Sequence, residues 1–166
     1  LGKGSLYGGT IQELKRRIIE SDFESGAGGM ERVEVLDRYI TDVARRFELA
    51  RPMKVAVDSG NGTGSLVAEK LLTAIGADVT PLFCDSDPTF PNHHPDPTVD
   101  KNLEDLIEAV RDTPHDLGVA FDGDADRIGA VDENGAIIRG DILLLLYGLD
   151  ILKRRGPGQK LVFDVK

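Results

Sequence analysis

LGVAFDGDADRIGAVDENG, residues 117–135, holds the pattern that decides the fold of this chain. A short apolar run is followed by three aspartates at alternate positions, an arginine, and a second apolar run that ends at Asn134 and Gly135. The first run predicts a buried strand, and Asn-Gly between apolar runs is the strongest short-range signal for a β-hairpin. We therefore expect a strand over 117–121, then a loop, and then a hairpin at the edge of a sheet.

Strands and helices alternate before this stretch. Apolar runs at 53–57 and 78–83 predict two further strands, and helical patterns cover 66–75 and 103–110. Such alternation implies right-handed crossovers between parallel strands, with helices packed on the sheet. The expected fold class is α/β, with a mixed, mostly parallel sheet and helices on both faces.

Pieces of neighbouring domains are expected on either side of this unit. Thr10 and Glu13 form a capping-box pattern for an N-terminal helix, and a glycine-rich connection follows it. Asp141 is expected to cap a helix that ends near Gly156, with a strand after it. We predict a helical tail of one domain over 1–30, a complete metal-binding α/β domain over 31–138, and the opening helix and strand of a third over 139–166.

Composition excludes several classes of protein. The 166 residues are 40% hydrophobic and 30% charged, which is typical of a globular protein. A net charge of −9 argues against binding to nucleic acid. The longest apolar stretch, 142–152, is well short of the ~20 residues that a membrane span needs. Cys84 is the single cysteine, so we expect a reducing compartment, the cytoplasm.

The three aspartates are the main candidate site. Carboxylates this close repel one another unless a cation or hydrogen-bond donors offset their charge. Asp122, Asp124 and Asp126 directly follow a predicted parallel strand, where ligands bind in α/β folds. Oxygen ligands suit Mg²⁺ or Ca²⁺, and Arg127 offers a planar fork that matches phosphate oxygens. A metal beside such an arginine points to phosphoryl transfer.

Other interpretations of these segments stay open. Counting from Asp122, acids also fall at positions one, three, five and twelve of a calcium-binding loop, with Glu133 as the twelfth, although Arg127 replaces the required glycine. A solvated acidic turn is the simplest alternative. DSGNGTG, residues 58–64, could bind a nucleotide phosphate, but a tight strand-to-helix turn capped with the help of Asn61 is favoured. FPNHHPDP, residues 90–97, is expected to be an ordered structural or interdomain loop, which is favoured over a role of His93 or His94 as a ligand.

The motifs together resemble those of a known family. FDGDADR is similar to the metal-binding loop of the α-D-phosphohexomutases, in the phosphomannomutase/phosphoglucomutase branch, where glycine often stands at the position of Ala125. MKVAVDSGNGTG, FPNHHPDP, LGVAFDGDADRIGAV and the closing FDVK agree with that family in order and spacing. The resemblance covers essentially the whole chain.

The resemblance implies an enzyme that interconverts hexose 1-phosphates and 6-phosphates through a phosphoserine and a hexose bisphosphate. It implies that Asp122, Asp124 and Asp126 bind Mg²⁺, and that Arg127 contacts the phosphoserine or the transferring group. It also implies that Lys166 reaches the same active site. The partners implied are the hexose phosphates and the remaining domains of the same polypeptide.

Three motifs of the family are missing from this sequence. It has no serine loop like TASHNP, no sugar-recognising loop like GEMSGH, and no C-terminal phosphate-binding loop. We therefore expect the chain to be a fragment that is inactive by itself.

Overall fold

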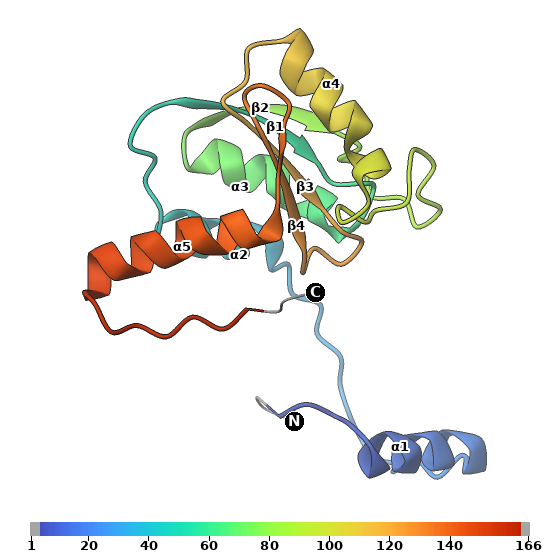
Figure 1. Cartoon of the computed structure of the whole chain (residues 1–166). Coiled ribbons are helices and arrows are strands. Elements are labelled where there is room, and N and C mark those ends of the chain that lie inside the picture. The colour runs from blue at the N-terminus through green and yellow to red at the C-terminus, as the bar shows by residue number, and fades with distance from the viewer. Residues whose placement is uncertain (1–3, 164–166) are drawn as a thin grey trace. The chain divides into compact units, whose positions relative to one another are not determined.

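The computed structural model describes residues 4–163, and the chain forms two compact units, 1–33 and 34–166. The smaller unit holds the helix α1 (Gly9–Glu20). The larger one contains a five-stranded sheet and the remaining helices (Figure 1).

The sheet has the strand order β2-β1-β3-β4-β5. The strands are β1 (Met53–Asp58), β2 (Ala77–Leu82), β3 (Leu117–Phe121), β4 (Ile128–Asp132) and β5 (Ile137–Ile138). β1 pairs in parallel with both β2 and β3, whereas β4 is antiparallel to β3 and to β5. Four of the five described strands therefore point the same way, and the predicted mixed, mostly parallel sheet is confirmed.

Helices cover both faces of the sheet. Alternate residues of β1 point to opposite faces of the sheet. Val55 and Val57 lie on one face and pack with α3 (Ala68–Ala74). α3 in turn contacts α2 (Leu36–Ala44). Ala56 faces the other side and packs with α4 (Glu104–Asp112), which follows the 3₁₀ turn η2 (Asp100–Leu103). The α/β class with two covered faces is confirmed, and this two-sided burial makes the strand ends a rigid base for the loops.

α4 packs closely on β3 because Gly118 has no side chain. A Cβ on Gly118 would lie 2.9 Å from Cγ2 of Val110 and 3.1 Å from Cγ of Leu106. Leu106 and Val110 are four residues apart, on one face of the helix, and both are buried. This contact holds β3 in place directly before the aspartate loop.

Two predicted helix caps are wrong. α1 begins at Gly9, so Thr10 lies inside the first turn, and Glu13 instead pairs with Arg16 and Arg17. α5 (Gly140–Arg155) begins one residue before Asp141, whose carboxylate accepts the N–H of Ile142. Glu13 and Asp141 thus each accept from a donor within their own helix. Neither helix has a side-chain hydrogen bond at its N-cap.

The strand expected after α5 is not formed in the described residues. Residues 161–163 have no regular structure, and 164–166, which include Lys166, lie outside the described part of the chain.

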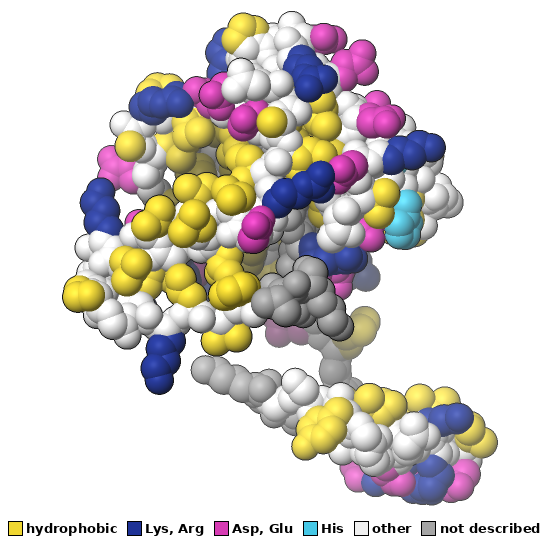
Figure 2. Space-filling model, in the orientation of Figure 1, with side chains coloured by type: hydrophobic (Ala, Val, Ile, Leu, Met, Phe, Trp, Pro, Cys, Tyr) yellow, Lys and Arg dark blue, Asp and Glu magenta, His cyan; other side chains and the backbone are white. Residues whose placement is uncertain are grey.

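α5 exposes much apolar surface. Its only buried residue is Gly148, and Leu145, Tyr147 and Leu149 are each more than half exposed. Figure 2 shows hydrophobic side chains gathered over this helix. No helix between residues 4 and 163 has the length and apolar character needed to cross a membrane.

Candidate metal centre

The aspartate loop lies at the carboxyl end of the sheet. β3 ends at Phe121 and β4 begins at Ile128, so residues 122–127 form the connection between these two antiparallel strands. The loops that follow the parallel strands β1 and β2 leave the sheet at the same edge. Ligand sites in α/β folds occur at this edge.

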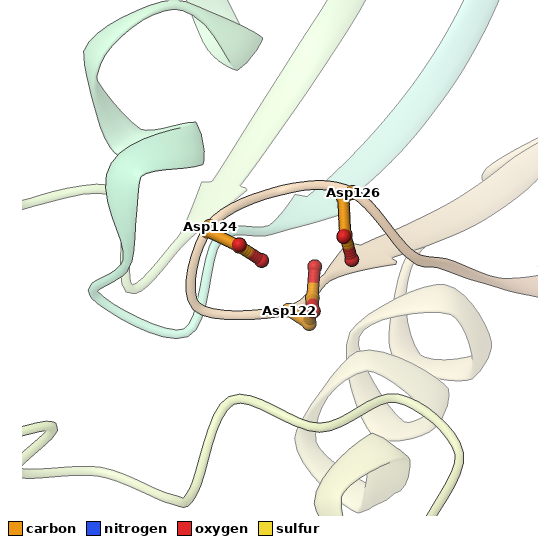
Figure 3. Close-up of side chains that lie close together, drawn as sticks. All are labelled: Asp122, Asp124 and Asp126. Atoms are coloured by element: carbon orange, nitrogen blue, oxygen red, sulfur yellow. The ribbon is translucent and has the colours of Figure 1, made fainter. Parts of the chain in front are cut away.

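The three predicted carboxylates meet at one point. One oxygen each of Asp122, Asp124 and Asp126 lies within 4.8 Å of the others. Figure 3 shows the three side chains directed toward one another across the loop. The bend that achieves this is closed by the N–H of Ala125, which donates to the carbonyl of Asp122 at 3.0 Å. Ala125 has a left-handed φ of 60°, a conformation that costs roughly 1–2 kcal/mol for a residue other than glycine.

The charges of the loop are only partly balanced. Burial opposes ionisation of Asp122, which is 2% exposed, but the backbone N–H and guanidinium of Arg127 outweigh burial and lower its pKa. The charge of Asp124, and then that of Asp122, raises the pKa of Asp126. Three oxygen donors with unbalanced negative charge fit a hard divalent cation, which would relieve the repulsion.

Arg127 donates hydrogen bonds to two aspartates, one inside the aspartate loop and one outside it. Its backbone N–H donates to Oδ1 of Asp122 at 2.9 Å, and its Nε to Oδ2 of Asp122 at 2.8 Å. Its Nη1 donates to Oδ1 of Asp96 at 3.2 Å, and the side chain is 51% exposed. Asp96 was not among the residues predicted to belong to the site. The order Asp-Pro-Thr is typical of an Asx turn and could have drawn attention to it.

The glycine-rich loop after β1 supports the aspartate loop. The N–H of Thr63 donates to the carbonyl of Gly123 at 3.0 Å, and a Cβ on Gly62 would lie 2.7 Å from that same oxygen. Gly62 is therefore required for close backbone contact between the two loops.

Asn61 does not cap the following turn, contrary to expectation. The 3₁₀ turn η1 (Thr63–Leu66) has Gly62 at its N-cap, with no side-chain hydrogen bond. The side-chain amide of Asn61 donates instead to the carbonyl of Asp85, and its oxygen accepts from Asn92. Asn61 thus joins the loop after β1 to the long loop after β2, which it contacts at two points. The backbone N–H groups of residues 61, 62 and 63 already donate to the carbonyls of Phe83, Ser59 and Gly123, so the nucleotide-binding alternative gains no support.

The calcium-loop alternative is not supported either. That loop requires a helix on each side, whereas the aspartates lie between β3 and β4. Glu133 is exposed in the hairpin turn and is not a member of the acidic cluster. The spacing match was therefore fortuitous.

His93 connects the proline-rich loop to β1. Its Nε2 lies 3.0 Å from Oδ2 of the buried Asp58, and its Nδ1 lies 3.0 Å from the carbonyl of His94. A carbonyl can only accept, so Nδ1 carries a hydrogen, and an ionised Asp58 also requires one on Nε2. Burial by itself lowers the pKa of His93, but the His94 carbonyl and the Asp58 carboxylate outweigh it and raise this pKa.

This pair predicts a pH-dependent stability. The pKa of His93 is raised in the folded chain, so protonated His93 contributes to the stability of the fold. This contribution is complete below the ordinary histidine pKa of about 6.5 and is lost as the pH rises through the pKa that His93 has in the folded chain. We expect the free energy of unfolding, measured in urea, to fall over that range in the wild type and to fall less in His93→Gln. His94→Gln is the matched control and should follow the wild type. Equal slopes for wild type and His93→Gln would contradict the prediction.

Comparison with protein families shows to which family the chain belongs. Residues 37–135 match the family model described as phosphoglucomutase/phosphomannomutase, alpha/beta/alpha domain II. The chain belongs to this family. The matched residues include the strands β1 to β4, the aspartate loop and the Asn134–Gly135 turn, so the resemblance stated from the motifs is confirmed.

Individual relatives agree with the family assignment. The chain is 48% identical over 156 residues, 94% of its length, to a phosphomannomutase/phosphoglucomutase of Pseudomonas putida, covering 34% of that protein. It is 47% identical to a phosphoglucomutase of Neisseria meningitidis, with all of this chain and 36% of that protein covered. A solved phosphoglucomutase/phosphomannomutase family protein of Burkholderia thailandensis superposes with a TM-score of 0.82 and 42% identity, over 90% of this chain and 32% of that one.

The chain spans about a third of the length of the curated relatives it matches. Membership of this phosphomutase family implies a metal cofactor, and the acidic cluster is the group of residues that fits one.

Proposed function

We propose that this chain is the metal-binding part of a phosphohexomutase. The whole enzyme interconverts hexose 1-phosphates and 6-phosphates through a phosphoserine and a hexose bisphosphate. The observation that carries the proposal is the meeting of three carboxylates at the carboxyl end of the sheet, in a chain of the phosphoglucomutase/phosphomannomutase family.

In this proposal Asp122, Asp124 and Asp126 hold Mg²⁺. Bound there, Mg²⁺ neutralises negative charge on the phosphoryl group in transit. Asp122 also accepts two hydrogen bonds from Arg127 and so keeps its own carboxylate ionised. Arg127 uses its remaining N–H donors to bind oxygens of the phosphoserine or of the transferring group. Lys166 reaches the same active site and assists proton transfer.

The division of the chain follows from the same proposal. Residues 1–30 are the helical tail of a first domain, 31–138 form the metal-binding domain, and 139–166 open a third. The exposed apolar residues of α5 support this division, because the remainder of a third domain would cover them. The chain's partners are then the other domains and the hexose phosphates, with no nucleic acid and no membrane, in the cytoplasm.

Activity assays test the proposal. The longer enzyme is expected to convert mannose 1-phosphate or glucose 1-phosphate to the 6-phosphate when a hexose bisphosphate activator and Mg²⁺ are present. The 166-residue chain should give no turnover under the same conditions, because it has no serine loop of the family type. Turnover by the chain alone, or a longer enzyme inactive on every hexose 1-phosphate, would contradict the proposal.

A further inference from the structure

Asp96 lies outside the aspartate loop but binds its arginine. It comes from the proline-rich loop, 31 residues before Arg127 in the sequence. Its Oδ1 accepts from Nη1 of Arg127, while Nε of the same guanidinium donates to Asp122. Asp122 in the aspartate loop and Asp96 in the proline-rich loop therefore bind two different nitrogens of one planar guanidinium group.

Asp96 is itself held rigidly. Its Oδ1 accepts the N–H of Thr98 at 3.1 Å and the Thr98 hydroxyl at 2.7 Å, and its carbonyl accepts from the Asn102 side chain at 2.9 Å. Pro95 and Pro97 on either side are buried. The hydrogen bonds from Thr98 also lower the pKa of Asp96, so it is a charged acceptor at neutral pH.

Arg127 needs such a second contact to keep one orientation. Its side chain is half exposed, and an arginine held at one point alone keeps much of its rotamer freedom. Its Nη2 has no hydrogen-bond partner among residues 4–163 and remains available to an anion. The orientation of that free end is set by the bonds at Nε and Nη1.

We propose that Asp96 is a positioning residue of the metal centre, acting through Arg127. It fixes the guanidinium across the aspartate loop so that the free Nη2 is presented to a phosphate in one orientation. The inference rests on the proposed function, because that function supplies the phosphate.

The variant Asp96→Asn separates this role from that of the turn. In the wild type one oxygen, Oδ1, accepts from Thr98 and from Nη1 of Arg127. The amide oxygen of asparagine can take its place toward both, so the variant removes only the negative charge of the acceptor, which makes the hydrogen bond to the guanidinium weaker. Asp87→Asn is a matched control in the same loop, because Oδ1 of Asp87 accepts from the N–H of Thr89 at 2.9 Å and from its hydroxyl at 2.7 Å. No arginine among residues 4–163 binds Asp87. Both variants are expected to unfold at nearly the wild-type urea concentration, since a half-exposed ion pair contributes little to stability.

The first measurement needs neither metal nor substrate. NMR relaxation of the Nε–H group of Arg127 in the metal-free 166-residue chain reports how tightly the guanidinium is held. We expect a lower order parameter in Asp96→Asn and the wild-type value in Asp87→Asn. An unchanged order parameter in Asp96→Asn would overturn the inference and leave the proposed function standing.

The second measurement uses the longer enzyme. Asp96→Asn is expected to lower kcat by roughly 10-fold, the lower end of the effect of losing a partner that orients a metal-site residue, with little change in KM. Asp87→Asn should keep the wild-type kcat. A wild-type kcat in Asp96→Asn would overturn the positioning role even if the arginine became more mobile. Absence of mutase activity in the wild-type enzyme would instead count against the proposed function.

Discussion

Replacing Asp124 by asparagine is expected to lower the turnover of the longer enzyme by at least about 100-fold. Losing a partner that only orients a metal ligand costs about 10–100-fold, so losing a ligand itself should reach or exceed the top of that range. Asp124 is the best of the three aspartates to test, because it is exposed and its side chain makes no hydrogen bond within the described residues. Asp122, in contrast, also holds Arg127.

The same substitution should leave the fold intact. The charge of Asp124 raises the pKa of Asp126, so removing that charge relieves repulsion in the metal-free loop. We expect the free energy of unfolding of the metal-free chain to stay the same or to rise slightly. Glu133→Gln is the control and should keep wild-type turnover, whereas a calcium loop ending at Glu133 would lose function with it. Near-normal turnover in Asp124→Asn would remove this residue from the site.

Replacing Gly62 by alanine is expected to damage both stability and the metal centre. The added Cβ would meet the carbonyl oxygen of Gly123 at 2.7 Å and its Cα at 3.0 Å. These are backbone atoms, so one of the two loops must move, at a cost of roughly 1–3 kcal/mol. The two loops support each other and one of them is the aspartate loop, so we expect Mg²⁺ binding to weaken and the free energy of unfolding to fall.

Gly64→Ala is the matched control for this effect. A Cβ at Gly64 would have ordinary contacts, the nearest at 3.5 Å from Cβ of Phe121 and from Oγ of Ser59. Urea unfolding and Mg²⁺ titration of both variants make the comparison. If Gly62→Ala were as stable as Gly64→Ala and bound Mg²⁺ equally well, the two loops would not support each other as described.

Features with local causes could be predicted from the sequence. The strand at 117–121 and the hairpin at Asn134 and Gly135 depend on apolar runs and turn chemistry within a few residues. The meeting of the three carboxylates was also predictable, because they are at alternate positions of one short loop after a buried strand.

Contacts between distant segments could not be predicted in the same way. Asp96 and Arg127 are 31 residues apart, and Asp58 and His93 are 35 apart, so only the folded chain brings each pair together. The capping box failed for a different reason. Glu13 has arginines one turn further along α1, and it pairs with them instead of with the start of the helix.

Titration of the metal-free 166-residue chain with Mg²⁺, followed by NMR of its backbone amides, tests the metal centre most directly. We predict weak binding, since no phosphoserine is present to complete the ligands, with shifts concentrated in residues 122–127 and absent around Glu133. Asp124→Asn should remove these shifts. Shifts confined to other parts of the chain, or equal binding by wild type and Asp124→Asn, would contradict a metal centre formed by the three aspartates.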